Sequence, residues 1–144
     1  MANQDTIKLL RECDAGIKTG IASIQEVLSD VKDFKLGEIL RDSVDTHRLL
    51  GHKTESLLQK YGEEGKEPGT MAKTMTWMKT NMKLAADNSD ATIADLITDG
   101  CGMGIKSVSR YINQYSKADT QAMDIAKNLR DIEEELEISL REYL

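Results

Sequence analysis

Few side chains in this chain of 144 residues could take part in chemistry. It has two histidines, His47 and His52, and two cysteines, Cys13 and Cys101. The histidines are five positions apart, which places them about 140° apart around a helix, so they do not bind one metal ion together. The cysteines form no Cys-x-x-Cys motif, and no nucleophile can be paired with a base. The sequence therefore predicts no catalytic residue and no cofactor, and it favours a protein that is not an enzyme.

Two polar residues interrupt apolar stripes at helical spacing. For His47, a core histidine satisfied by hydrogen bonds is the main interpretation, and a metal ligand or proton acceptor is the alternative. Asp14 interrupts the first stripe and is expected to be buried. In an antiparallel hairpin of the first two helices, positions whose numbers sum to about 68 face each other. The carboxylate of Asp14 is therefore expected to meet Thr54 or Lys53. A satisfied polar contact in the core is the main interpretation, and a general base is the alternative.

The elements that carry these residues are predicted from apolar residues at spacings of three and four. They indicate long helices over about 5–33, 36–61, 90–115 and 119–143, each about 38 Å long. A shorter helix is predicted over 70–86, in the connection between the two pairs. Packing of this helix on the bundle is the main interpretation, and a docking surface for a protein partner is the alternative. It carries a methionine stripe and a tryptophan: Met71, Met75, Met78, Met82 and Trp77.

The composition excludes several classes of protein. A formal charge of -6 argues against a nucleic-acid binder, which needs a basic face. No apolar run approaches the roughly 18 residues of a membrane span, and the beginning MANQDTIKLL lacks the layout of an export signal. We therefore expect a protein of the cytoplasm with reduced cysteines. Its length fits one domain, residues 1–144, and its single proline argues against a sandwich or barrel.

The two halves of the sequence share a short repeat. The pattern C-x-x-G-I-K occurs at 13–18 and again at 101–106, and Leu-Arg-Asp occurs at 40–42 and 129–131. If Cys13 and Cys101 face each other they could form a disulfide, but small buried apolar side chains are the better interpretation. Five glycines lie inside predicted helices, where each costs about 1 kcal/mol relative to alanine, so they indicate close helix contacts. These are Gly16, Gly20, Gly100, Gly102 and Gly104.

With paired hairpins, a long crossover and glycines in the first and third long helices, the chain resembles the ferritin-like (rubrerythrin-like) four-helix bundles of bacteria. The resemblance implies an all-α, antiparallel four-helix bundle with a short extra helix in the crossover between the second and third long helices. Members of this superfamily typically hold two metal ions between the helices. One carboxylate comes from each of the first and third long helices, and an E-x-x-H motif comes from each of the second and fourth.

This ligand pattern is incomplete in the present sequence. Ile17 and Ile105 stand where the two single carboxylates are expected, and Val44 and Leu136 replace two residues of the E-x-x-H motifs. Two of the six expected ligands remain, which cannot hold two carboxylate-bound ions. They are His47 and Glu133. The acidic segment from Asp131 to Glu142 is expected to be a solvated helix face, and Glu133 or Glu134 is the candidate to reach the interior from it.

Two functions follow as hypotheses. The first is a non-catalytic bundle that has lost its two-metal site and serves as a structural or protein-interaction module, as a homodimer. The second is a metal-binding or oxidative-stress protein with an unconventional site. That site would use His47, Glu133, Asp14 and Glu26.

Overall fold

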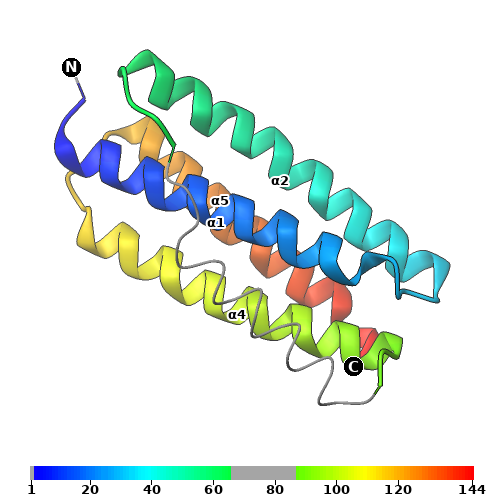
Figure 1. Ribbon diagram of the computed structural model, residues 1–144. Helices are drawn as coiled ribbons and strands as arrows, with labels where there is room; N and C mark the ends of the chain where they lie inside the picture. Colours follow the sequence, from blue (N-terminus) through cyan, green and yellow to red (C-terminus); the bar gives the residue numbers. More distant parts are fainter. Residues whose placement is uncertain (1, 66–86) are drawn as a thin grey trace.

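Four long helices make up most of the computed structural model, which describes residues 2–65 and 87–144 (Figure 1). They are α1 (Gln4–Leu28), α2 (Phe34–Lys60), α4 (Asp90–Gln114) and α5 (Thr120–Leu140), and a short 3-10 turn, η1 (Arg141–Tyr143), follows. Within the described ranges there is no β-strand. The four helices predicted from the sequence are confirmed. The predicted helix over 70–86, with its methionines and Trp77, lies outside the described residues.

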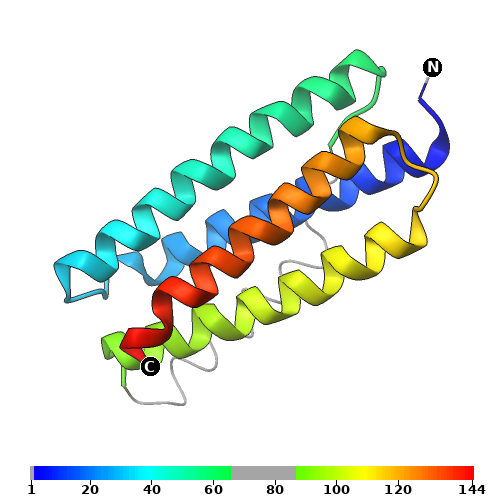
Figure 2. The same ribbon diagram turned by 180° about the vertical axis from the view of Figure 1, so that it is seen from behind.

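The helices form an antiparallel bundle in the order α1, α2, α5, α4 around its axis (Figures 1 and 2). At one end, the Asp90 carboxylate at the beginning of α4 accepts hydrogen bonds from the amides of Lys32 and Asp33, between α1 and α2, at 2.8 and 2.9 Å. At the other end, the Tyr61 hydroxyl at the end of α2 donates to Asp119, at the beginning of α5. α2 therefore ends at the opposite end of the bundle from the beginning of α4.

Each long helix begins at a residue whose side chain accepts a hydrogen bond from the first turn, as good N-caps do. These residues are Asn3, Asp33, Ser89 and Asp119. The end of α2 is also well defined, because Gly62 has φ of 73°, which favours glycine. The Gly62 amide donates to the Gln59 carbonyl and the Glu63 amide to the Leu58 carbonyl, as in a Schellman motif. The predicted ends of the first and fourth long helices, 33 and 143, were too late, since α1 ends at Leu28 and α5 at Leu140.

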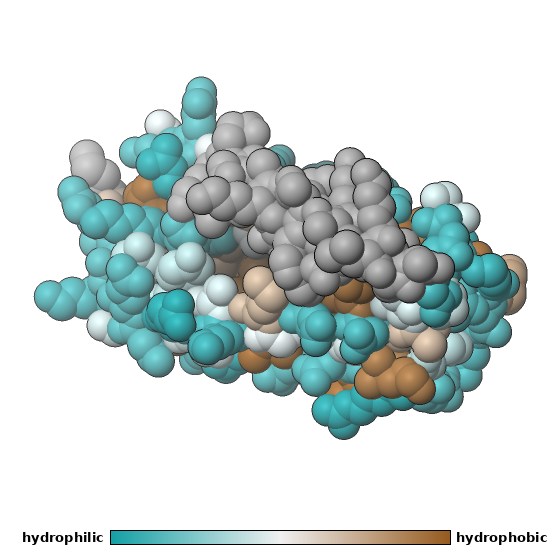
Figure 3. Space-filling view, turned by 60° about the horizontal axis from the view of Figure 1, so that its bottom comes forward, coloured by the Kyte–Doolittle hydropathy of each residue, from teal (hydrophilic) through white to brown (hydrophobic). Residues whose placement is uncertain are grey.

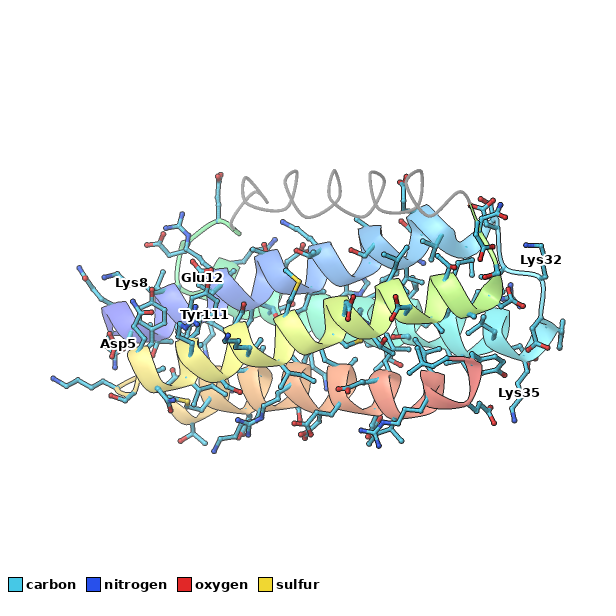
Figure 4. All side chains as sticks on the ribbon, turned by 90° about the horizontal axis from the view of Figure 1, so that it is seen from below. Asp5, Lys8, Glu12, Lys32, Lys35 and Tyr111 are labelled. Atoms are coloured by element: carbon cyan, nitrogen blue, oxygen red, sulfur yellow. The ribbon has the colours of Figure 1, made fainter. Side chains whose placement is uncertain are left out.

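The two ends of the bundle are polar. Figure 4 shows Lys32 and Lys35 at one end and Asp5 and Lys8 at the other. The Asp5 carboxylate accepts from the Lys117 amide at 3.1 Å, which ties the beginning of α1 to the connection between α4 and α5. The face in Figure 3 is mainly hydrophilic with scattered hydrophobic side chains. No helix in the described part of the chain is long and apolar enough to cross a membrane.

The apolar core is divided into two clusters along the bundle axis. Apolar burial in both clusters is the main force that holds the helices together. The cluster near the beginning of α2 includes Ile24, Val44, Cys101 and Leu136. The cluster near the end of α2 includes Ile17, Leu50, Val108 and Leu129. On every helix the two clusters are separated by about two turns, and the residues in that gap form the candidate site.

Candidate functional site

In the gap between the two core clusters, each helix contributes a residue that is not a large apolar one. These residues are Gly20 of α1, His47 of α2, Gly104 of α4 and Glu133 of α5. His47 is fully buried and Glu133 is 8% exposed. The structure therefore places His47 and Glu133, the histidine and the carboxylate candidates from the sequence, at one level in the middle of the bundle. Glu133 is the member of the Glu133–Glu134 pair that reaches the interior, and Glu134 is exposed.

His47 and Glu133 bind each other directly. The imidazole Nε2 lies 3.0 Å from Glu133 Oε1, and Nδ1 lies 2.7 Å from the backbone carbonyl oxygen of Ser43. A carbonyl oxygen only accepts, so Nδ1 carries a hydrogen. A second proton must lie between Nε2 and Oε1, because two lone pairs at 3.0 Å would repel each other in a buried site. The pair is thus held together by a proton between imidazole and carboxylate.

The environment of His47 favours its protonated form. Burial by itself lowers the pKa of His47, because it disfavours a charged imidazolium. The hydrogen bond and negative charge of Glu133, with the Ser43 carbonyl, outweigh burial and raise this pKa above 6.5. The raised pKa favours the protonated imidazole, and with the geometry of both ring nitrogens we take the pair as an imidazolium and a carboxylate.

The two glycines of this level have different roles. A Cβ atom on Gly20 would lie 2.7 Å from His47 Nε2 and 2.9 Å from Cδ2, so only glycine leaves room for the imidazole. A Cβ atom on Gly104 would lie 3.5 Å from Glu133 Cδ, which is an ordinary contact. The close approach predicted for the helical glycines is therefore confirmed most sharply at Gly20. It is wrong for Gly100 and Gly102, where an added Cβ would meet nothing within 4 Å.

Two further side chains, Ser43 and Cys101, interact with the His47–Glu133 pair. The Ser43 hydroxyl lies 3.4 Å from His47 Nδ1, on the same helix. The pKa of the Cys101 thiol is raised, first by burial and then by the charge of Glu133 and a hydrogen bond to it. Ser43, Gly104 and Cys101 were not identified as site residues from the sequence. Of these three residues, only Gly104 had a signal in the sequence, as one of the glycines expected at close helix contacts.

The two cysteines are free, and both are buried. They belong to different core clusters, so they do not face each other. Burial, followed by the nearby carboxylates of Glu12 and Asp14, raises the pKa of Cys13 to about 12. Both thiols therefore remain protonated at neutral pH and pack as small apolar side chains, which was the main interpretation of the sequence.

Asp14 is buried as predicted, but its expected partners were wrong. Its carboxylate binds Lys18 of the same helix at 2.8 Å, and Lys53 is exposed. The predicted register itself holds, since a Cβ on Gly51 would lie 3.3 Å from Ile17 and these two positions sum to 68. Thr54 is buried opposite α1, but its hydroxyl donates to the Leu50 carbonyl one turn earlier. A threonine hydroxyl in a helix often makes this local bond, and Asp14 then finds a cation on its own helix.

Asp14 also lies away from the His47–Glu133 level. Six residues of α1 separate Asp14 from Gly20, which is about 9 Å along the helix. The Asp14 carboxylate is instead next to Gly65, where an added Cβ would clash with it. Asp14 is therefore not part of the mid-bundle pair.

The apolar residues at the expected ligand positions are not all in the core. Ile17, Val44 and Leu136 are buried, at 2%, 5% and 5% exposure. Ile105 is half-buried and belongs to neither cluster, although it stands where a ligand facing the interior was expected. The neighbouring Gly104 faces Glu133 instead, because one helical position turns the side chain by about 100°.

The donor set at this level does not fit a two-metal centre. Among the residues that the structure describes, no group of three or more His, Cys, Asp or Glu side chains is placed to hold a metal ion. Both nitrogens of His47 are engaged in hydrogen bonds, and Glu133 receives the imidazolium. Two carboxylate-bridged ions require several oxygen ligands around each ion, which this pair does not supply.

Comparison with known proteins supports the fold alone. No family model matches the chain, and no curated protein matches it in sequence. A similar solved structure is Dps92 from Deinococcus radiodurans, with a TM-score of 0.75 and 12% sequence identity over 98% of this chain and 86% of that one. This chain has the ferritin-like fold. At this identity the similarity supports the predicted fold class and carries no residue roles.

Proposed function

We propose that this protein is a non-catalytic ferritin-like bundle in which a proton-linked His47–Glu133 pair replaces the two-metal centre. It serves as a structural or protein-interaction module and works as a homodimer. Two free, buried cysteines are compatible with a reducing compartment, so we place it in a bacterial cytoplasm.

One observation carries this proposal: the only two expected ligands that remain in the sequence are each other's partners. Glu133 neutralises the buried imidazolium, and the Ser43 carbonyl takes the other N–H. A metal ion at this place must displace the proton on Nε2 and break the contact between His47 and Glu133, so it competes with an existing internal pair. Gly20 supports the interpretation that the pair replaces a metal centre, because it leaves room for the imidazole and supplies no ligand.

A metal-binding or oxidative-stress protein is the second candidate. It is favoured by the position of His47 and Glu133, which place an imidazole and a carboxylate in the middle of the bundle. It is weakened by Asp14, which pairs with Lys18 and lies about two turns away. In this case the His47 proton would have to leave before an ion could bind Nε2.

Metal loading separates the two candidates. The purified protein is titrated with Fe(II) without oxygen, desalted, and its metal content is measured by elemental analysis. We expect well under one ion per chain, and no difference between the wild-type protein and His47→Ala. Two tightly bound ions per chain would contradict the proposal. One ion that is lost in His47→Ala would support the second candidate.

A further inference from the structure

The outer side of α2 carries a second stripe that does not face its own bundle. This α2 stripe consists of Ile39, Asp42, Thr46, Leu49, Lys53 and Leu57, at spacings of three and four residues. Its four central members are exposed, and Leu49 is 66% exposed. Ile39 and Leu57 at its ends are partly buried against the two core clusters. Residues at these spacings lie on one side of a helix, so this stripe forms a single surface that another helix can contact.

We propose that the α2 stripe binds the α2 stripe of a second copy of this chain, with the two helices antiparallel. This inference rests on the proposed function, and it assigns the surface through which the module pairs with itself. It goes beyond that function by naming the residues in contact.

The sequence of the stripe is self-complementary about its middle. A two-fold axis perpendicular to α2, between residues 47 and 48, places Asp42 opposite Lys53 of the second copy, since each lies about 8 Å from the axis along the helix. The same axis places Thr46 opposite Leu49 and Ile39 opposite Leu57. Every apolar residue of the stripe then meets an apolar group, and each carboxylate meets an ammonium. Thr46 fits this scheme, because its hydroxyl donates to the Asp42 carbonyl and leaves the methyl group for contact.

A groove beside the α2 stripe adds a second carboxylate to the charge complementarity of the two copies. α2 and α5 lie side by side on the face seen in Figure 2, and a groove of about 220 Å³ runs between them. Its lining includes Asp42 of α2 and Glu135 of α5, with apolar side chains of Ile39 and Ile132. In the antiparallel arrangement, Lys53 of the second copy lies over these two carboxylates. A basic residue thus meets two acidic ones at each end of the interface.

The size of the surface predicts a weak dimer. From Ile39 to Leu57 the stripe is about 27 Å long, which is enough for five turns of helix contact. One helix pair with part of a groove is at the lower end of the areas found in specific interfaces. We therefore expect monomer and dimer to exchange at micromolar concentrations, with charge pairs that fix the register more than they add affinity.

Sedimentation equilibrium of the full chain, from about 1 to about 300 µM, tests the proposal. We expect the mass to rise from one to two copies of 16.1 kDa. Leu49→Asp should weaken dimerisation by about ten-fold or more, because it buries a carboxylate against Thr46. Met103→Asp is the matched control, since Met103 is 51% exposed on α4, away from the stripe, and its effect should be small. Circular dichroism verifies that each variant is folded.

Charge reversal tests the register. Asp42→Lys and Lys53→Asp should each weaken the dimer by about five-fold, and the double variant should return to within about two-fold of the wild-type affinity. A monomer at all concentrations, a dimer insensitive to Leu49→Asp, or a double variant without rescue would each overturn the proposal. Metal analysis of the same samples keeps the two proposals apart. A metal-free monomer overturns this interface and the homodimer but leaves the proposed loss of the two-metal centre standing, whereas two ions per chain overturn the proposed function.

Discussion

At the scale of single residues, the protein is distinguished by a buried pair that depends on one proton. His47 donates one N–H to the Ser43 carbonyl and shares the other proton with Glu133. Without that proton, a buried carboxylate would face the lone pair of a neutral imidazole. The energy of the middle of the bundle therefore depends on pH as well as on packing.

We predict that the protein becomes less stable as the pH rises above 6.5. The folded-state pKa of His47 is raised, so the unfolded chain loses this proton first. The contribution of the pair is complete below pH 6.5 and is lost as the pH rises through the folded-state pKa, at up to about 1.4 kcal/mol per pH unit. Urea denaturation at pH 6.0 and about 8.5 measures this change.

The control for this experiment is His47→Gln, which has no titratable group at this position and should show a much flatter profile. The upper limit stays below pH 9, the ordinary pKa of the cysteines, because the raised pKa values of Cys13 and Cys101 add a further loss above it. Equal pH dependence in the two proteins would contradict the proton-linked pair.

We also predict that Gly20→Ala is destabilising and Gly104→Ala is not. The new methyl group at position 20 must displace a fully buried imidazole, at a cost of about 1–3 kcal/mol after the better helix propensity of alanine is included. At position 104 the contact is ordinary, so the helix propensity should leave the protein unchanged or up to about 1 kcal/mol more stable. Thermal unfolding compares them, and equal effects would mean that His47 is not held against Gly20.

At the scale of helices, the sequence predicted the elements well because each must bury one stripe of apolar side chains. The stripe from Ile7 to Val31 indicated the first helix, for example, but its end was placed five residues late. The reason is that Val31 still packs on the core from the connection, so burial alone does not mark the end of a helix. The partner of Asp14 was missed for a related reason: the register was right, but local bonds of Lys18 and Thr54 took precedence.

The junction at Asp119 should contribute strongly to the pairing of helices. Its carboxylate caps α5 by accepting from the Ala122 amide and also accepts from the Tyr61 hydroxyl, and its amide donates to Thr6. Asp119→Ala should therefore cost about 1–2 kcal/mol in the free energy of unfolding. Asp124→Ala, at an exposed position of the same helix, should stay within about 0.5 kcal/mol of the wild-type value. Similar values for both variants would show that the cap and the Tyr61 bond contribute little.

At the scale of the whole molecule, the bundle separates its apolar core into two clusters with a polar level between them. The sequence identified His47 and Glu133 as the members of that level, because they remained from a recognisable ligand pattern. It did not predict that they bind each other, since this depends on the approach of α1 at Gly20 and on the rotation of α4 that turns Gly104 inward. The half-buried Ile105 is the consequence of the same rotation.

The most direct test of the central claim is nitrogen NMR of the His47 imidazole, with and without Zn(II) as a diamagnetic probe. Both ring nitrogens should carry a proton at pH 6.5, and their chemical shifts should not change when the metal ion is added. An unprotonated Nε2 in the metal-free protein, or loss of its proton when Zn(II) binds, would contradict the claim that this pair has replaced a metal centre.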